Sequence, residues 1–166
     1  QENKVADAFI CRGLSYLHLK DTVRAYDNFN TAIRTNRENP NGYNRRGGLY
    51  MEQKRYPEAE ADFNKAIECD STYLLSYFNR ALVYSNTNRP MLALSDFDKV
   101  IQLDSTTSLT YFNRAMLRTQ IGAYNRALAH YDNVALYSPN HVLVYYHRAG
   151  VYAPLGEIDK AAEDST

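Results

Sequence analysis

Tyr77-Phe78-Asn79-Arg80-Ala81 is the stretch that decides the fold, because its pattern returns every 34 residues along the chain. One period earlier stands Tyr43-Asn44-Arg45-Arg46-Gly47, and one period later stands Tyr111-Phe112-Asn113-Arg114-Ala115. Two further copies stand at the two ends of this series, Phe9-Ile10-Cys11-Arg12-Gly13 and Tyr145-Tyr146-His147-Arg148-Ala149. No insertion or deletion interrupts the 34-residue period from the first copy to the last. Self-similarity at this period is typical of repeat proteins, in which one supersecondary unit stacks on copies of itself.

The period divides the 166 residues into a short leader, four whole repeats and one partial repeat. We expect a single array over residues 1–166, with repeats at 6–39, 40–73, 74–107, 108–141 and a partial repeat at 142–166. The last repeat stops early in its second helix, before any polar capping helix. The sequence therefore favours a segment of a longer array.

Apolar residues recur at helical spacing within each repeat, and turn signals divide the repeat into two helices. In the third repeat we expect helices over about 74–87 and 90–103. Pro40, Pro57 and Pro90 mark helix starts, because proline fits the first turn, where its missing N–H would be unsatisfied anyway. The Asp-Ser-Thr stretches at 70–72 and 104–106 are typical of turns between repeats.

Small residues recur at two fixed positions, and large aromatic residues recur beside them. Small side chains let helix backbones approach closely, so both sets are expected to pack the helices together. The small residues are Gly13, Gly47, Ala81, Ala115 and Ala149 on the first helix, and Ala25, Ala59, Ala93, Ala127 and Ala161 on the second. The aromatic residues are Tyr16, Tyr50, Tyr84 and Tyr152, then Phe29, Phe63, Phe97 and Tyr131.

This order of residues resembles the tetratricopeptide repeat family over essentially the whole chain; in the second repeat it comprises Tyr43, Gly47, Tyr50, Ala59, Phe63 and Ala66. The resemblance implies an all-α fold, a right-handed superhelical solenoid of antiparallel helix pairs. It also implies a protein-interaction scaffold rather than an enzyme. Arg118 departs from the pattern, since it replaces the first-helix tyrosine in the fourth repeat.

The composition argues against several classes of partner. With 19 basic and 19 acidic residues the formal net charge is +0, so no global field attracts nucleic acid. No apolar run approaches the ~18 residues of a membrane span, which predicts a soluble chain without membrane insertion. Cys11 and Cys69 stand at different repeat positions and are expected to be unpaired thiols in the core.

Catalysis and cofactor binding find no support in the sequence. The four histidines form no i, i+4 pair and have no acidic partner at metal-ligand spacing. No glycine-rich phosphate loop and no nucleophile motif is present. We therefore expect no catalytic residues, no metal and no cofactor.

A recurring arginine could bind an anion or could serve the packing of the helices. It is matched on the second helix by a recurring acidic or polar position, which favours a structural pair between helices. The arginines are Arg12, Arg46, Arg80, Arg114 and Arg148, and the matching residues are Asn28, Asp62, Asp96, His130 and Asp164. For a stability test we paired Arg80 with Asp62 and Arg114 with Asp96.

The leading functional hypothesis is a protein or peptide partner held by apolar anchors in the concave groove of the first helices. The resemblance places the following residues there: Asn44, Arg45, Leu75, Phe78, Asn79, Leu82, Leu109, Phe112, Asn113, Met116, Tyr146 and His147. The family's carboxylate clamp is essentially absent, since its positions hold Ile10, Leu14, Arg45, Leu75 and Asn79. The alternative is a purely structural stripe, used for packing of further repeats or for self-association through the truncated ends.

Overall fold

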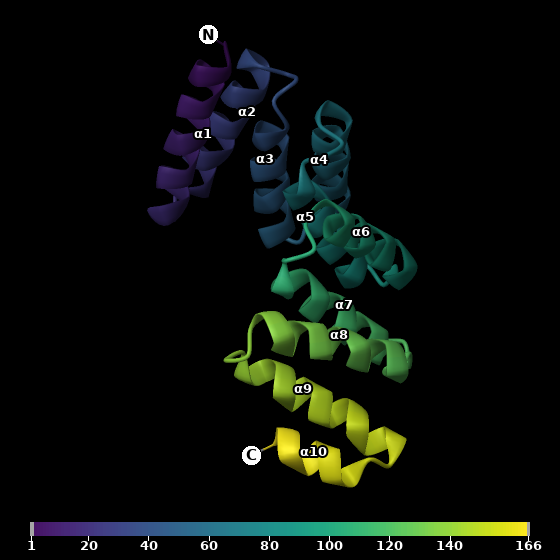
Figure 1. Ribbon diagram of the computed structural model, residues 1–166. Helices are drawn as coiled ribbons and strands as arrows, with labels where there is room; N and C mark the ends of the chain where they lie inside the picture. The colour runs from purple at the N-terminus through teal and green to yellow at the C-terminus, as the bar shows by residue number, and fades with distance from the viewer. Residues whose placement is uncertain (1, 166) are drawn as a thin grey trace. The chain divides into compact units, whose positions relative to one another are not determined.

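The computed structural model describes residues 2–165, and the regular elements in this range are helices (Figure 1). The α-helices are α1 (Glu2–His18), α2 (Thr22–Thr35), α3 (Pro40–Glu52), α4 (Tyr56–Cys69), α5 (Leu74–Asn86), α6 (Pro90–Leu103), α7 (Ser108–Gln120), α8 (Tyr124–Tyr137), α9 (Val142–Tyr152) and α10 (Ile158–Asp164). A 3-10 turn, Ala153–Leu155, lies between α9 and α10. The third repeat thus has its helices at 74–86 and 90–103, within one residue of the expectation.

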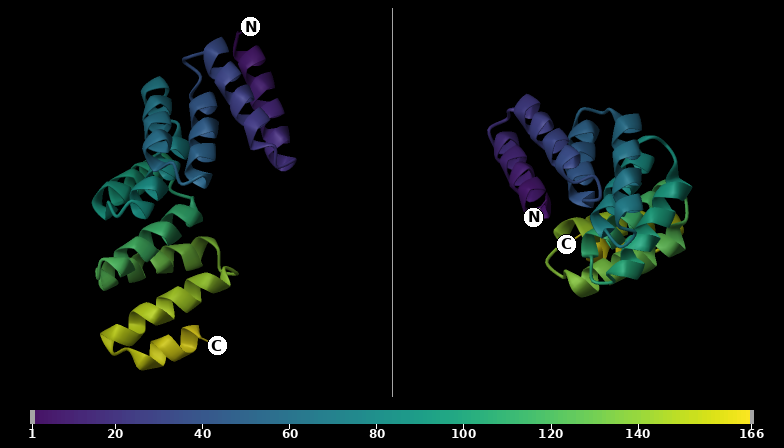
Figure 2. Two further views of the ribbon diagram at one scale, coloured as in Figure 1. Left: turned by 180° about the vertical axis from the view of Figure 1, so that it is seen from behind. Right: turned by 90° about the horizontal axis from the view of Figure 1, so that it is seen from above.

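The helices form two compact units, Gln1–Asn88 with α1 to α5 and Arg89–Thr166 with α6 to α10. Within a unit, successive helices pack side by side, as α1 with α2 and α7 with α8 in Figures 1 and 2. The predicted all-α class and the pairwise packing of helices are confirmed. The single array over residues 1–166 stays a prediction.

A left-handed backbone residue follows the first helix of every repeat. These residues stand 34 positions apart and are Lys20, Lys54, Asn88, Gly122 and Gly156, with φ between 57° and 77°. The left-handed conformation stops a helix and turns the chain back toward the next one. In the first repeat the turn is closed when Asp21 N donates to Tyr16 O at 2.9 Å. The helix–turn–helix unit is therefore repeated in the backbone as well as in the sequence.

The predicted prolines and Asp-Ser-Thr turns behave as expected. Pro40 and Pro90 are the first residues of α3 and α6, and Pro57 lies in the first turn of α4. Asp70 Oδ1 accepts from Thr72 N at 2.8 Å and from Thr72 Oγ1 at 2.7 Å. These bonds hold the pKa of the Asp70 carboxyl below its usual value and fix the turn between α4 and α5.

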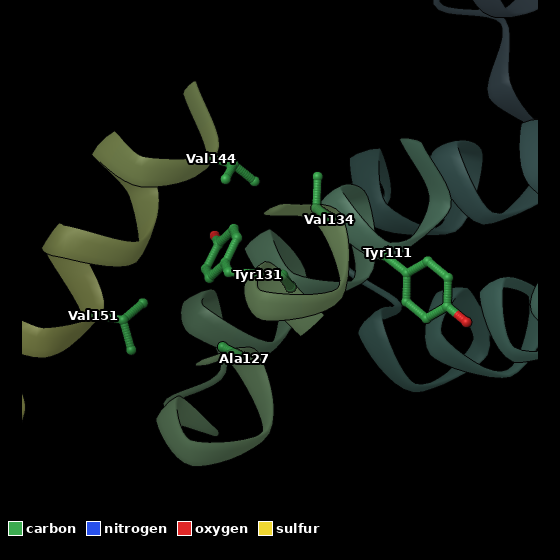
Figure 3. Packing of buried hydrophobic residues seen from close by; sticks show 7 residues of the cluster. Tyr111, Ala127, Tyr131, Val134, Val144 and Val151 are labelled. Carbon is green, nitrogen blue, oxygen red and sulfur yellow. The ribbon is translucent and has the colours of Figure 1, made fainter. Parts of the chain in front are cut away.

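The core of each unit lies between the paired helices and is made by the predicted small and aromatic residues. In the first unit, Tyr50, Ala59 and Phe63 pack with Val83 of α5. In the second unit, the Tyr131 ring lies between α8 and the α9 residues Val144 and Val151 (Figure 3). Fourteen-residue helices are marginal alone, so this shared burial stabilises them.

The thiols differ from the expectation. Cys11 and Cys69 are free, but Cys11 is exposed and Cys69 is only half-buried, so the predicted core location was wrong. Cys11 lies on an exposed part of α1. In residues 2–165 no helix has both the length and the apolar character that a bilayer crossing needs.

Candidate functional site

The recurring arginine joins two second helices in the first unit. Arg46 Nε and Nη2 donate to the two carboxylate oxygens of Asp62 at 2.8 and 2.6 Å. Arg46 Nη1 donates to Asn30 Oδ1 at 2.6 Å. The guanidinium of α3 thus binds α4 with one edge and α2 with the other. The bond to Asp62 raises the pKa of Arg46, and the carboxylate is 8% exposed.

The pairing of Arg80 with Asp62 was wrong by one repeat. Arg80 Nη1 donates to Asn64 at 2.6 Å, while both Asp62 oxygens accept from Arg46. Residues two apart on a helix point to nearly opposite sides, so Asp62 and Asn64 face different neighbours. The sequence spacing is 16 residues in both directions from the arginine.

The same 16-residue spacing joins the matched positions in other repeats, which supports the structural interpretation of the arginines. Arg12 Nε donates to Asn28 at 2.5 Å in the first unit. In the second unit, Arg148 donates to Asp164 at 2.7 and 2.6 Å and to Asp132 at 2.7 Å. These bonds raise the pKa of Arg148.

Arg114 is the exception among these arginines. Its expected pairing with Asp96 is wrong, because Asp98 and His130 are its partners. Its Nη1 donates to Asp98, and its Nη2 lies 3.0 Å from His130 Nδ1. Arginine can only donate, so Nδ1 accepts and the imidazole carries its proton on Nε2. Arg114 is 9% exposed, and its Nε is buried without a hydrogen-bond partner in residues 2–165.

Arg118 adds a second, half-buried cation one helical turn along α7. Its Nε is buried without a hydrogen-bond partner in the described chain. Burial, followed by the charge of Arg114, lowers the pKa of Arg118, and Arg126 acts in the same direction. Burial, followed by Arg114 and Arg118, lowers the pKa of His130 to about 4. Asp98 is the acidic group that opposes these effects.

Two of the predicted groove residues of the first unit, Asn44 and Asn79, form a polar contact between α3 and α5. Asn44 is 4% exposed, so its predicted exposure was wrong. Its Oδ1 accepts from Ser76 Oγ at 3.1 Å and from Asn79 Nδ2 at 3.0 Å. The small Ser76 lets α5 approach α3 and cover the amide. The other residue of this set on α3, Arg45, donates to Asn41 at 3.2 Å.

The remaining predicted residues of α5 vary in exposure. Leu75 is 42% exposed, whereas Phe78 and Leu82 are half-buried. These residues belong to the first unit, and the predicted residues of α7 and α9 belong to the second. The structure thus describes two separate sets of groove residues.

In the second unit the equivalent helix contact is aromatic. The Phe112 ring lies 5.4 Å from the His147 ring and 5.2 Å from the His141 ring, measured between centroids. Tyr146 meets His147 edge-on at 5.5 Å. Burial, followed by His141, lowers the pKa of His147, so its neutral form is favoured at pH 7.

Phe112 and His147 are 35 positions apart, as are Asn44 and Asn79. The same pair of repeat positions therefore joins neighbouring first helices in both units.

Exposed apolar side chains surround the aromatic contact of α7 and α9. On α7 they are Leu109 at 52% and Met116 at 39%, and on α9 they are Leu143 at 57% and Tyr146 at 70%. Asn113 lies between them, and its Nδ2 donates to Leu109 O at 2.8 Å. We call Leu109, Phe112, Met116, Leu143, Tyr146 and His147 the α7–α9 face.

Sequence reasoning missed the cluster of Arg114, Arg118 and His130. The signal was present, because the fourth repeat departs from the pattern at two positions, with Arg118 for tyrosine and His130 for an acid or amide. Each departure alone changes only local packing. Together they place His130 and Arg118 beside Arg114, and Arg118 also lies near Arg126 and the carboxylate of Asp98.

Two sequence profiles, each described as a tetratricopeptide repeat, match residues 40–73 and 63–95. No curated protein sequence matches the chain significantly. A solved structure of YrrB, described as a tetratricopeptide repeat protein with an unusual peptide-binding site, is similar with a TM-score of 0.78. It is 21% identical, and the match covers 94% of this chain and 80% of YrrB.

Two other solved structures show similar folds. PilF of Pseudomonas aeruginosa has a TM-score of 0.86 at 23% identity, covering 96% of this chain and 72% of its own. MamA of Desulfovibrio magneticus RS-1 has a TM-score of 0.86 at 13% identity, covering 96% and 90%. Proteins of this repeat family generally mediate protein–protein interactions and are typically non-catalytic. From its repeated motif, its paired helices and these matches, the chain is a tetratricopeptide repeat protein.

Proposed function

We propose that the protein is an interaction scaffold that binds a partner segment with apolar anchors on the α7–α9 face. The observation that carries the proposal is the exposure of Leu109, Leu143 and Tyr146 around the Phe112–His147 contact. Contiguous exposed apolar side chains mark interaction sites more often than chance exposure. A helix or an extended peptide that places two apolar side chains here would bury them against α7 and α9.

The half-buried ring of Phe112 supports this assignment, since it is held in place before any partner binds. Phe112 packs against the core cluster and meets Tyr131 edge-on at 6.2 Å. Binding to a preorganised surface costs less ordering entropy than binding to a mobile one. Phe112 would therefore provide a preorganised contact surface, and the exposed side chains near it would pack against the sides of the bound segment.

Amide groups would fix the orientation of the bound segment. Asn113 uses one amide hydrogen within α7, which leaves its second hydrogen and its oxygen for a peptide backbone. In the first unit, Asn79 Nδ2 donates to Asn44. In that unit we propose Arg45, Leu75, Phe78 and Leu82 as a secondary contact set in its own right. YrrB, described as having a peptide-binding site, supplies a precedent for a peptide partner on this fold.

Random peptides displayed on phage and selected on the intact chain would test the proposal. Selected peptides should carry two spaced apolar residues, with affinity measured by fluorescence anisotropy. Because anchors at an interface contribute about 2 kcal/mol or more, Leu109→Ala with Tyr146→Ala should weaken binding roughly 30-fold or more. Both side chains are at least 52% exposed, so the fold should survive.

Leu136→Ala is the matched control, because Leu136 of α8 is 73% exposed but lies outside the α7–α9 face. It should leave the affinity unchanged. If the double variant binds as tightly as the parent, the α7–α9 face is not the binding site. The alternative of a purely structural, self-associating stripe predicts concentration-dependent dimers in sedimentation, which the double variant would dissociate.

A further inference from the structure

We infer that Arg114, Arg118 and His130 form a binding site for a phosphate group, carried by a small molecule or by a partner. The site belongs to the second unit and is built by α7 and α8 with Asp98 of α6. It is distinct from the α7–α9 face. Arg114 and Phe112 are two residues apart on α7, so their side chains point to nearly opposite sides.

Unused hydrogen-bond donors are the first argument for a phosphate ligand. Arg114 Nε and Arg118 Nε are buried, and within residues 2–165 neither has an acceptor. His130 adds its Nε2–H, since Nδ1 accepts from Arg114. A buried donor without an acceptor is destabilising, and a bound oxyanion would supply the missing acceptor.

The charge of the cluster is the second argument. Arg118 lies near the cations Arg114 and Arg126 and near the carboxylate of Asp98. His130 is neutral, so these named groups carry three positive charges and one negative charge. A phosphate monoester carries about −1.5 to −2 at pH 7 and would neutralise this excess. A carboxylate ligand would neutralise only half of it.

The other repeats supply the third argument, because they neutralise the same arginine internally. Arg46 has Asp62, and Arg148 has both Asp164 and Asp132. The position of Arg118 holds a tyrosine at Tyr50 and Tyr152. In the fourth repeat, His130 thus replaces the acidic residue that binds the arginine in these repeats, and Arg118 replaces the tyrosine. Both replacements lie near the guanidinium of Arg114. The Asp98 side chain, which binds Arg114, is 54% exposed, so the cluster reaches the surface at this residue.

Inorganic phosphate is the first probe. The His130 imidazole resonances of the full chain are followed by NMR during titration with phosphate at pH 7, at constant ionic strength maintained with chloride. We expect a saturable shift and a thermal midpoint that rises with phosphate. No saturable shift, or the same shift with chloride alone, would overturn the proposal.

Arg118→Tyr restores the residue of the other repeats and keeps His130 as the reporter. It should reduce phosphate affinity at least tenfold. Arg118→Gln is the second variant, in case the tyrosine disturbs packing, and both folds are checked by circular dichroism. Arg37→Gln, which removes an exposed arginine of the first unit, is the charge-matched control and should bind as the parent does. Unchanged affinity in both Arg118 variants would contradict the site.

A second probe separates the two sources of the phosphate group. Capped phosphoserine is compared with inorganic phosphate by the same His130 shift. Tighter binding of capped phosphoserine supports a phosphorylated partner, and equal or weaker binding supports a free phosphate or a small phosphate ester. Both outcomes require the loss of binding in the Arg118 variants. The phosphate result is independent of peptide binding, because the Leu109 and Tyr146 changes leave the cluster intact.

Discussion

Arg46 in the first unit and Arg114 in the second occupy the same repeat position but have different surroundings. Arg46 is satisfied by a buried carboxylate and an amide, and its neighbour one turn along α3 is Tyr50. Arg114 has a neutral imidazole and a half-exposed carboxylate, and its neighbour one turn along α7 is Arg118. One repeat position can thus serve either as a structural pair or as an anion site. The difference depends on the residue one turn along the same helix and on side chains from the neighbouring helices.

The largest expected effect is the difference in the free energy of unfolding between a variant that lacks Arg46 and a variant that lacks Arg114. Arg46→Met leaves Asp62 buried and unpaired, which should lower the free energy of unfolding by about 3 kcal/mol. Arg114→Met leaves a neutral His130 and the half-exposed Asp98 and removes repulsion with Arg118. It should cost only about 1 kcal/mol. Urea denaturation measures both values.

A double-mutant cycle gives the control for this comparison. Adding Asp62→Asn to Arg46→Met removes the buried unpaired charge and should restore part of the lost stability. Strict additivity of the two changes, or equal losses for Arg46→Met and Arg114→Met, would remove the distinction between the two sites.

A smaller effect concerns the residue that follows each arginine, which is Gly47 in the first unit and Ala115 in the second. A Cβ at Gly47 would lie 2.8 Å from Phe63 Cε1, so Gly47→Ala should destabilise the protein by about 2 kcal/mol. Gly48 has nothing within 4 Å of such a Cβ, and Gly48→Ala should stabilise α3 by about 0.5–1 kcal/mol. Thermal unfolding of the two single variants should therefore shift in opposite directions. Shifts of the same sign would contradict the close approach at Gly47.

The smallest effect is a pH dependence that His130 gives to the second unit. The folded pKa of His130 is about 4, below its ordinary value of 6.5, because of burial and then Arg114 and Arg118. The unfolded chain binds the proton more readily, so this contribution is complete above pH 6.5 and is lost as the pH falls toward 4. After allowance for partial solvent exposure, we expect a loss of about 1 kcal/mol between pH 7 and pH 4.5.

His130→Asn gives the control for the pH dependence, because it copies the Arg12–Asn28 pair of the first repeat. The variant should lose this part of the pH profile. The groups that surround His130 are Arg114, Arg118 and Tyr111 of α7 and Asp98 of α6. His147, whose pKa is also lowered, titrates in the same direction and remains in the variant. A profile identical to the parent would assign the whole effect to groups other than His130.

The sequence by itself determined the repeat, the helix pairs and most of the core. The 34-residue period, with prolines and small residues at constant positions, allows one placement of the helices and turns. This is because helix starts, helix ends and close helix contacts depend on the residue types at those positions. The recurrence of an arginine and of an acidic or polar residue at two fixed repeat positions also followed from the sequence, whereas the bond between Arg46 and Asp62 came from the structure.

Only the tertiary structure decided which neighbour each side chain meets across helices. The repeat positions predicted exposure for Asn44, yet Ser76 and Asn79 cover it because α5 approaches α3 at a small residue. The pairing of Arg80 with Asp62 failed because Asp62 and Asn64 point to opposite sides of α4. The cationic cluster of Arg114, Arg118 and His130 likewise required the packing of α6, α7 and α8. The spacing of residues along the sequence predicts which face of a helix a side chain occupies. The residue that it contacts on another helix depends on the distance between the two helices, which several side chains determine together.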